Sequence, residues 1–531
     1  MIIGMVHLRC KINKMKNIKK HILWADDEIN SLKPHIIFLE SKGYSVIGVN
    51  SGEDAIEVCK KSSIDLLLVD EMMTGLDGLS TIKIVKEKHP DIPIIMVTKN
   101  EEEWLMDEAI GEHIEDYLTK PVNPSQILIA CKKVFENKSI QSNKALKDFI
   151  SFFNTFDDAN LNTINDWFSI YSKICNWSIQ LDNVNDSNIM NMLKEQKYSL
   201  NKSFSNFVEL NYKNWINNSN TDSPILSNQV FSKFVKPLIS EDRKLIFIII
   251  DCLTLDQWKK ISELLYPSYR IKEDFHLSIL PSATPFARNA IFSGLLPNEI
   301  KNKLPEIWNN MYSSDKLNGS EDILFSKMLD RNNINKKFNY FKVSDYDEGT
   351  RFLNKINDYK KTDIIALVVN FVDILGHSRS ESNILKELLP NDSSYRNAIF
   401  NWFEKSWLKE SLDIFREWNA DIVLTADHGN IQINKQVMLK ADQNVSSGIR
   451  YKYGRNLNVN NDNNIFKIKN PEEYSLPKFE INTEYAIAKN DSFFVYKNDY
   501  HKYVNIYKKT FQHGGISMDE LIIPVVHLSK K

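Results

Sequence analysis

Two groups of residues in this sequence have the types and spacing that chemistry requires, and the first lies in the N-terminal quarter of the chain. Acidic, hydroxyl or lysine side chains directly follow four predicted strands. The group comprises Asp26, Asp27, Asp70, Thr98 and Lys120. Carboxylates placed together repel one another unless a cation is present, and oxygen-rich sites of this kind suit Mg²⁺. A carboxylate beside Mg²⁺ can attack a phosphoryl group, whose oxygens Thr98 and Lys120 could then hold.

The second group lies in the C-terminal half and combines carboxylates with imidazoles. Its members are Asp251, Thr284, Asp373, His377, Asp427, His428 and His513. Carboxylate plus imidazole is the ligand chemistry of Zn²⁺ or Mn²⁺. Two metal ions ~4 Å apart could activate a nucleophile and stabilise a leaving oxygen.

Thr284 is the candidate nucleophile of the second group. The pair Thr284-Pro285 predicts a helix start, with the threonine at the N-cap and the proline at the first helical position. A hydroxyl at a helix N-terminus faces free backbone N–H groups and the positive end of the helix dipole. That environment favours an alkoxide and a bound phosphate.

The first group must be positioned by alternating strands and helices. Strands are predicted at 22–25, 44–49, 65–69, 92–97 and 116–118, and helices at 28–40, 53–60, 79–87, 104–111 and 124–134. This alternation predicts a five-stranded doubly wound parallel sheet. Functional residues in such sheets gather at the carboxyl ends of the strands, where this group lies.

Residues 137–219 have a different character. Aromatic and apolar residues recur at helical spacing, and no strand signal or proline interrupts them. Phe149, Trp167, Phe204 and Tyr212 belong to this pattern. It predicts a small helical bundle whose aromatic stripe forms a core.

The α/β rhythm returns after residue 245 and positions the second group. Strands are predicted at 245–250, 364–371, 422–425, 492–495 and 522–528. Members of the group follow the first three of these strands, and His513 precedes the last one. The fold class is therefore α/β, with two such domains joined by a helical linker. The predicted boundaries are 1–20 for a flexible N-terminal extension, 21–136, 137–219 and 220–531.

Composition limits the class of protein. The 531 residues suggest three or four domains, and 42% hydrophobic with 26% charged residues excludes disordered, collagen-like and disulfide-scaffold proteins. A net charge of −2 gives no global field for nucleic acid or membrane surfaces. No apolar run approaches the ~18 residues of a membrane span. No helix-turn-helix or basic winged domain is visible, so direct DNA reading is not expected.

Two further features concern location. The five cysteines are scattered without a CxxC pair, which suits free thiols in a reducing cytoplasm. The basic first 20 residues lack an apolar core and a cleavage site, so a signal peptide is not expected. Met15 lies a few residues before the first predicted strand, so the preceding residues are expected to be a flexible or mis-assigned start.

Residues 21–136 resemble the receiver domain of response regulators. The resemblance implies that Asp70 is the phosphoacceptor and that Asp26, Asp27 and the Met72 carbonyl complete a Mg²⁺ site. It implies switch roles for Thr98, Tyr117 and Lys120. The segment EMMTG at 71–75 departs mildly from the family pattern, which usually has proline before the glycine.

Residues 240–531 are similar to the alkaline phosphatase superfamily. The similarity implies one metal ion on Asp251, Thr284, Asp427 and His428, and another on Asp373, His377 and His513. The phrase TADHGN at 425–430 also occurs in cofactor-independent phosphoglycerate mutases, which use a serine nucleophile and a different domain plan. The whole order resembles PorX-type response regulators with a C-terminal PglZ domain, and SATPFARNAIFSG at 282–294 is especially close to them.

That resemblance implies a zinc-dependent phosphodiesterase or phosphatase acting on oligonucleotide-type substrates. It also implies a sensor histidine kinase, a phosphorylation-dependent homodimer, an extracytoplasmic-function sigma factor as a target, and control of type IX secretion. Two alternatives stay open. One is a phosphorylation-dependent binding protein whose metal site is structural or ligand-sensing, and the other is a phosphomutase.

Overall fold

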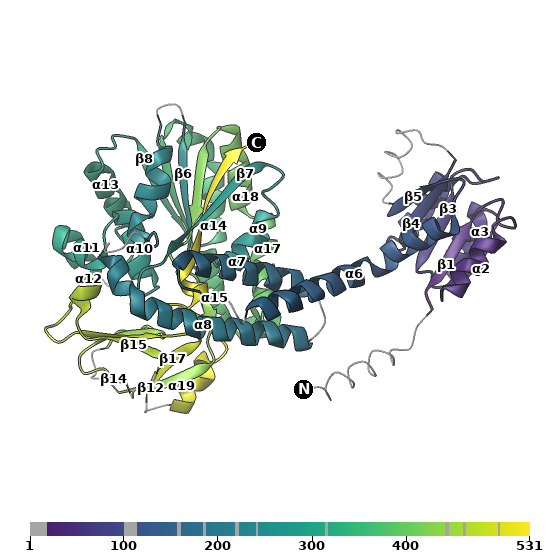
Figure 1. The fold of residues 1–531 in the computed structure, drawn as a ribbon. Coiled ribbons are helices and arrows are strands. Elements are labelled where there is room, and N and C mark those ends of the chain that lie inside the picture. The colour runs from purple at the N-terminus through teal and green to yellow at the C-terminus, as the bar shows by residue number, and fades with distance from the viewer. Residues whose placement is uncertain are drawn as a thin grey trace, which may run out of the picture. The chain divides into compact units, whose positions relative to one another are not determined.

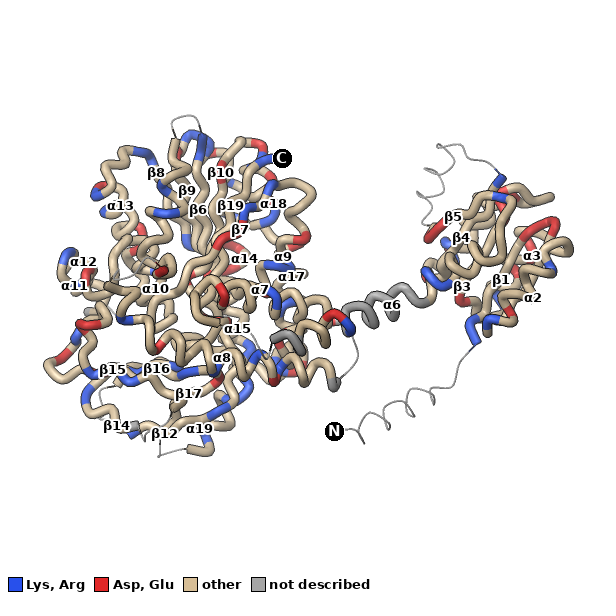
Figure 2. The backbone as a smooth tube through the Cα atoms, in the orientation of Figure 1, with Lys and Arg blue, Asp and Glu red and all other residues tan. Residues whose placement is uncertain are grey.

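The computed structural model describes residues 19–99, 114–156, 161–183, 187–217, 222–240, 243–313, 317–440, 445–459, 463–496 and 500–531. Two compact units are present, Met1–Lys147 and Asp148–Lys531 (Figure 1). The predicted helix at 104–111 lies outside the described residues, as does nearly all of the predicted extension at 1–20. Basic and acidic residues are interspersed in each unit, as expected from the near-neutral net charge (Figure 2).

The first unit contains a five-stranded sheet in the order β2-β1-β3-β4-β5, with every pair parallel. The strands are β1 (His21–Ala25), β2 (Ser45–Val49), β3 (Leu66–Asp70), β4 (Ile94–Thr98) and β5 (Asp116–Thr119). The helices are α2 (Lys33–Ser41), α3 (Gly52–Lys61), α4 (Gly78–Lys88) and the start of α6 (Pro124–Phe156). Alternate residues of each strand enter separate cores, with Leu23 and Leu67 on one face and Trp24 and Leu68 on the other. The predicted doubly wound parallel sheet is confirmed.

Three long helices follow, as the aromatic periodicity predicts. They are α6, α7 (Ile164–Gln180) and α8 (Ser187–Ile216), with a short turn η1 (Leu181–Asn183) between the last two. Thr163 and Asp166 form a capping box that begins α7. Trp167, Phe204 and Tyr212 are buried, so the aromatic stripe is core. Helices α7 and α8 belong to the same compact unit as the C-terminal sheet (Figure 1).

The second unit is built around a six-stranded sheet in the order β7-β19-β10-β6-β9-β8. The strands are β6 (Leu245–Ile250), β7 (Tyr269–Leu277), β8 (Phe338–Val343), β9 (Ile364–Val369), β10 (Asp421–Thr425) and β19 (Ile522–Lys530). Strands β10, β6, β9 and β8 are parallel, β19 pairs antiparallel with β10, and β7 pairs antiparallel with β19. Only β19 therefore runs opposite to the other five strands. All residues of β6 and β9 are buried, so both faces of the sheet are covered.

The sequence prediction needs three corrections here. The strand predicted at 364–371 ends at Val369, because Phe371 already begins helix α15 (Phe371–Glu381). The strand predicted at 492–495 is β17 (Ser492–Tyr496) in a small separate sheet, not in the central one. Strands β7 and β8 were not predicted, because their half-exposed residues form no continuous apolar run.

The remaining elements surround the central sheet. The helices are α9 (Leu255–Ser262), α10 (Thr284–Ser293), α11 (Pro297–Lys303), α12 (Pro305–Ser313), α13 (Glu321–Arg331), α14 (Tyr346–Asn354), α16 (Asn383–Leu388), α17 (Asp392–Glu404), α18 (Trp407–Glu417), α19 (Tyr500–Tyr507) and α20 (Met518–Leu521). Short helical turns are η2 (Ser227–Gln229), η3 (Phe231–Val235), η4 (Lys236–Leu238), η5 (Ile356–Lys361) and η6 (Pro471–Tyr474). Three small sheets are formed by β11 (Ile431–Gln432) with β18 (Phe511–Gln512), by β12 (Lys435–Lys440) with β14 (Asn458–Val459) and β17, and by β13 (Tyr451–Gly454) with β15 (Ile465–Ile468) and β16 (Glu484–Ala488). In the described part of the chain, no helix is both long and apolar enough to span a membrane.

Candidate functional sites

The carboxyl end of the first sheet brings the first residue group together. Oxygen atoms of Asp26, Asp27 and Asp70 all lie within 4.8 Å of one another. Lys120 reaches into this acidic cluster, and its Nζ donates to Asp70 Oδ2 at 2.7 Å and to Asp26 Oδ2 at 2.9 Å. Asp26 and Asp70 are buried, whereas Asp27 is exposed. One lysine opposite three carboxylates leaves an excess of negative charge, which a divalent cation can neutralise.

Burial dominates the electrostatics of this cluster. It raises the pKa of Asp70, and the nearby Asp26 carboxylate acts in the same direction. For Lys120, burial lowers the pKa, but its hydrogen bonds to Asp70 and Asp26 outweigh that effect and leave the pKa raised. The ammonium group therefore stays charged opposite the buried carboxylates.

The predicted switch residues occupy different environments. The Thr98 side chain is buried, and its hydroxyl donates to the carboxylate of Glu71. Tyr117 is 36% exposed and Met72 is 70% exposed. Sequence reasoning missed Glu71, and its position directly after Asp70 is the signal that could have found it.

The second sheet brings the seven residues of the second group together in two clusters. Asp251 follows β6, and Asp427 and His428 lie beyond the end of β10. Asp373 and His377 lie on helix α15 four residues apart, so they share one face, and His513 follows β18. Potential ligand atoms of Asp251, Asp427 and His428 lie within 4.8 Å of one another, and so do those of Asp373, His377 and His513.

The two clusters are neighbours. The imidazole rings of His428 and His513, one from each cluster, stack with centroids 4.3 Å apart and an interplanar angle of 18°. Within the second cluster, Asp373 Oδ1 lies 3.3 Å from His377 Nε2 and 3.7 Å from His513 Nε2. The two candidate ligand sets are therefore adjacent, as a two-metal site requires.

Thr284 lies beside the first of these clusters. Its Oγ1 is 3.0 Å from His428 Nε2. His428 Nδ1 is 3.1 Å from the Gly429 carbonyl, which can only accept, so the proton of the neutral ring lies on Nδ1. The Nε2 lone pair therefore points toward the Thr284 hydroxyl and the carboxylates, as a ligand nitrogen must.

The structure corrects one detail of the Thr284 prediction. Helix α10 has Ala283 at its N-cap in an extended conformation, which makes Thr284 the first helical residue and Pro285 the second. The Thr284 hydroxyl therefore does not cap the helix. It is free to face His428.

Two orphaned oxygens show that the first cluster fits a cation. Asp251 Oδ1 and Asp427 Oδ2 are buried and accept no hydrogen bond from any donor that the structure describes. Such buried acceptors are costly unless an ion satisfies them. Burial, reinforced by the Asp427 charge, raises the pKa of Asp251 to about 8. Burial also raises the pKa of Asp427.

The imidazoles are mostly held neutral. Burial lowers the pKa of His428 and lowers that of His513 to about 3, so both rings keep a free lone pair at neutral pH. His377 differs, because its hydrogen bond to Asp373 raises its pKa. Burial raises the pKa of Asp373, but the His377 hydrogen bond and the His513 ring outweigh it and leave that pKa lowered. Asp373 is thus an ionised ligand at neutral pH.

Sequence reasoning missed a buried arginine behind the first cluster. Arg288, one helical turn after Thr284, donates from Nη1 to Asp251 Oδ2 at 2.5 Å and lies 3.9 Å from Asp427 Oδ2. Its Nε donates to Glu321, which also accepts from the Tyr340 hydroxyl. This chain of contacts orients Asp251. In the sequence, the signal for this contact was an arginine among the apolar residues of segment 282–294.

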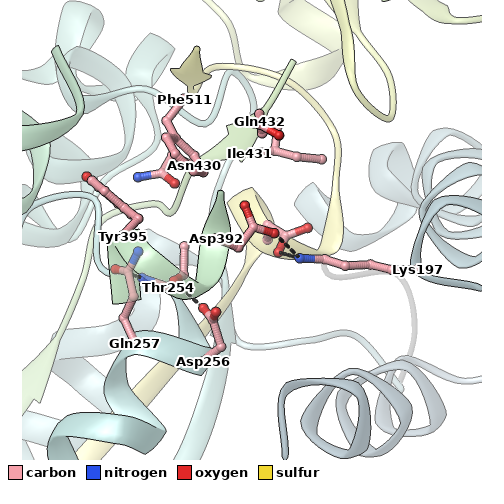
Figure 3. Close-up of a pocket in the computed structure, with 11 residues that line it drawn as sticks. Lys197, Thr254, Asp256, Gln257, Asp392, Tyr395, Asn430, Ile431, Gln432 and Phe511 are labelled. Atoms are coloured by element: carbon pink, nitrogen blue, oxygen red, sulfur yellow. Dashed lines mark hydrogen bonds and ion pairs between the residues drawn. The ribbon is translucent and has the colours of Figure 1, made fainter. Parts of the chain in front are cut away.

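The linker helices contact the back of this site. Lys197 of α8 lies 2.6 Å from Asp519 Oδ1 and 3.7 Å from Asp392 Oδ2, an arrangement drawn in Figure 3. Tyr171 of α7 and Asn201 of α8 also donate to Asp519. A Cβ on Gly429 would lie 2.0 Å from the Asp519 carbonyl oxygen, so this backbone packs directly behind the residue that follows His428.

Comparison with known families agrees with this geometry. Residues 22–132 match the response regulator receiver domain, 138–216 match the PorX response regulator linker domain, and 230–528 match the BREX system PglZ alkaline phosphatase-like domain. The chain belongs to the PglZ alkaline phosphatase-like family. Its domain order is that of a PorX-type response regulator.

Individual relatives match the receiver region of this PglZ-family chain. The alkaline phosphatase synthesis transcriptional regulatory protein PhoP of Bacillus subtilis is 31% identical over 125 residues, which are 23% of this chain and 51% of that protein. The regulatory protein VanR of Enterococcus faecium is 34% identical over 113 residues, which are 21% of this chain and 48% of VanR. The chain thus spans about half the length of these curated relatives.

Solved receiver structures also match. Chemotaxis protein CheY4 of Vibrio cholerae is 24% identical with a TM-score of 0.21, covering 22% of this chain and 99% of CheY4. The receiver domain of the Francisella response regulator 1452 is 24% identical with a TM-score of 0.22, covering 23% of this chain and 98% of that domain.

Proposed function

We propose that this response regulator is phosphorylated on Asp70 and that its PglZ domain is a two-zinc phosphodiesterase. The Mg²⁺ site would use Asp26, Asp27, Asp70 and the Met72 carbonyl, with Thr98, Tyr117 and Lys120 as switch residues. The proposed domain limits are 21–136, 137–219 and 220–531. A receiver domain implies phosphorylation by a sensor kinase.

The observation that carries the catalytic proposal is the position of Thr284. Its hydroxyl lies 3.0 Å from His428 Nε2, beside one ligand cluster and next to a second. Asp251, Asp427 and His428 would hold one Zn²⁺ with Thr284, and Asp373, His377 and His513 would hold the other. Zinc bound there would supply Lewis-acid stabilisation of the charge on the phosphoryl and leaving oxygens.

The chain's own residues supply the rest of the mechanism. Thr284 Oγ1 would attack phosphorus, forming a Thr–O–P bond while the bond to the leaving oxygen breaks. The hydroxyl proton of Thr284 would pass to water, and the leaving oxygen would take up a proton from water. Arg288 would hold Asp251 in place through their 2.5 Å hydrogen bond. Thr284 is the first residue of α10, so the phosphate that it attacks would lie near the first backbone N–H groups of this helix. Negative charge is favoured at that end of a helix. Water would then release the phosphoryl group from Thr284.

The proposal extends to regulation. Phosphorylation would favour a homodimer, and the protein would act in the cytoplasm. Its targets would be an extracytoplasmic-function sigma factor and type IX secretion components, as in the PorX-type regulators that it resembles.

The test is turnover of a chromogenic phosphodiester by the full chain with added Zn²⁺. Hydrolysis that depends on zinc and is removed by a chelator would support the proposal. Protein that binds two zinc ions but turns over no phosphodiester would instead favour a structural or ligand-sensing metal site.

A further inference from the structure

A hollow opens at the edge of the central sheet where the two ligand clusters lie. It lies at the carboxyl ends of β8 and β9 and has a volume of about 270 Å³. Its walls include Val343, Ser344, Tyr346, Phe371, Trp402 and Trp407. Sites for whole small ligands are roughly 300–1,000 Å³, so this hollow fits one ring system of a larger molecule.

Strand register places the hollow close to the ligand clusters. Ile250 of β6, Val369 of β9 and Val343 of β8 are aligned neighbours. The residue directly after β6 is the candidate ligand Asp251, and the residue directly after β8 is Ser344 in the hollow. Neighbouring strands lie about 5 Å apart, so these two positions are separated by roughly 10 Å.

Asn370 connects the two places directly. It follows Val369 on the strand between them, and its Nδ2 donates to Ser344 Oγ at 3.2 Å. Its Oδ1 accepts from Arg288 Nη1, the group that also holds Asp251, at 3.4 Å. The next residue, Phe371, lines the hollow and lies two positions before the ligand Asp373.

The aromatic walls are preformed. Phe371 and Trp402 stack with ring centroids 4.0 Å apart and an interplanar angle of 6°. Trp407 is buried against α14, where a Cβ on Gly349 would lie 2.1 Å from its Nε1. Tyr346 is 73% exposed at the same hollow. Flat rings fixed on helices are suited to stacking a planar group.

The charge of the hollow selects what enters. Asp345 is among its lining residues, and Asp347 and Glu348 follow on the first turn of α14. Asp345 Oδ1 accepts from the Glu348 backbone N–H at 2.7 Å, which fixes that carboxylate in place. A phosphate would be repelled here, whereas an uncharged ring carrying amino donors would not.

We propose that this hollow binds a nucleobase of the phosphodiester substrate whose phosphate lies at the two ligand clusters. The proposal rests on the proposed function and adds a base-binding subsite for the oligonucleotide-type substrate that the family resemblance implies. One sugar would bridge the interval between the phosphate at Asp251 and the base beside Ser344. Tyr346 and Trp402 would determine specificity by stacking, and neither would take part in bond breaking.

The experiment compares two ligands with the same phosphate. Adenosine 5′-monophosphate and ribose 5-phosphate are titrated into the zinc-loaded full chain, in a Thr284→Ala background to prevent turnover. Base stacking predicts that the nucleotide binds about 5- to 100-fold more tightly than the sugar phosphate. Tyr346→Ala and Trp402→Ala should each remove most of that preference and leave ribose 5-phosphate affinity unchanged.

Tyr266→Ala is the matched control, because Tyr266 is also an exposed tyrosine, at 55%, but does not line this hollow. Tyr346 is a surface residue, so its variant tests the proposal even if Trp402→Ala folds poorly. Equal affinity for the two ligands would show that the hollow does not bind a nucleobase, and it would leave the proposed phosphate site unaffected. If neither ligand binds the zinc-loaded protein, the proposed function itself is wrong and the nucleobase site falls with it.

Discussion

At the residue scale, both candidate sites depend on side chains that follow strands. Asp70 is the last residue of a fully buried strand and Asp251 directly follows one, so the backbone of the sheet fixes where their carboxylates lie. The charged groups around them then decide their protonation. Two predictions test the roles assigned to individual residues.

Replacing Asp70 should abolish phosphorylation. Asp70 accepts a 2.7 Å hydrogen bond from Lys120 and shares its acidic cluster with Asp26, so an Asn there keeps the shape but removes the attacking oxygen. Acetyl phosphate with Mg²⁺ should label the wild type but not Asp70→Asn, as mass spectrometry of the intact protein would measure. Asp91→Asn, an exposed carboxylate outside the cluster, should label normally. Label that persists on Asp70→Asn would place the phosphoacceptor elsewhere.

Thr284 should separate catalysis from metal binding. Thr284→Ala leaves Asp251, Asp427 and His428 in place, so it should retain most zinc while phosphodiester turnover falls by at least ~100-fold. Asp427→Ala and His377→Ala should lose zinc as well as activity. Zinc content and turnover are measured side by side on the same preparations. Wild-type turnover by Thr284→Ala would show that water attacks directly.

Much of both sites could be predicted from the sequence, because ligands that follow predicted strands must meet at one sheet edge. The grouping of Asp26, Asp27 and Asp70 needed only that rule, as did that of Asp251, Asp373, His377, Asp427 and His428. Thr284 entered through the predicted helix start at Thr284-Pro285, and His513 through its place before the last strand. Arg288 and Glu321 could not be found in this way. They lie in helices, and their burial depends on a tertiary contact between α10 and α13 that no local pattern encodes.

At the element scale, we expect a buried histidine on strand β7 to make stability depend on pH. His276 is fully buried, its Nε2 lies 3.0 Å from the Ala426 carbonyl, and burial lowers its pKa to about 4. Between about pH 4 and 6.5 the unfolded chain binds a proton that the folded chain refuses, so stability falls as the pH falls through that window. The loss amounts to roughly 3 kcal/mol at the acid end.

His276→Gln should reduce this pH dependence, because glutamine offers an N–H donor to Ala426 and does not titrate. Urea unfolding at pH 7 and pH 4.5 would measure it, following the second unit by tryptophan fluorescence. If the free energy of unfolding falls as much between pH 7 and pH 4.5 in the variant as in the wild type, groups other than His276 cause the acid sensitivity. Strand β7 could not be predicted from the sequence, because its exposed polar residues give no local strand pattern. Its pairing with β19, far away in the sequence, makes it a strand.

Within the second unit, the Lys197–Asp519 ion pair links helix α8 to helix α20. Lys197→Met removes one partner and leaves the buried Asp519 carboxylate less well compensated, so the second unit should lose roughly 3 kcal/mol of stability. Lys194→Met, an exposed lysine one turn earlier on the same helix, is the control. Thermal unfolding of both variants gives the difference. The double variant Lys197→Met/Asp519→Asn should recover part of the loss, because no unpaired charge remains.

At the scale of the whole molecule, helix α6 crosses the division between the two units. It runs from Pro124 to Phe156, and the units divide at Lys147 and Asp148. The chain therefore passes from the receiver into the second unit through continuous helix. The family match at 138–216 covers the same passage.

The proposed homodimer should respond to receiver activation. Beryllofluoride with Mg²⁺ mimics the phosphoryl group at Asp70, and the surface around Thr98, Tyr117 and Lys120 would change with it. Light scattering should show a mostly monomeric protein that doubles in mass when both ligands are present. Asp70→Asn should stay monomeric under the same conditions. A mass that is the same with and without the ligands would contradict the predicted dimer.

The contacts behind Gly429 also limit where recombination can divide the gene without disturbing the second unit. Tyr171, Lys197 and Asn201 hold Asp519, whose carbonyl leaves no space for a side chain at Gly429. Helices α7 and α8 are thus an integral part of the second unit rather than a spacer. Recombination between related genes can exchange the receiver near Lys147 and keep this support intact. A crossover at residue 219 would instead replace α7 and α8 with foreign helices that lack the partners of Asp519.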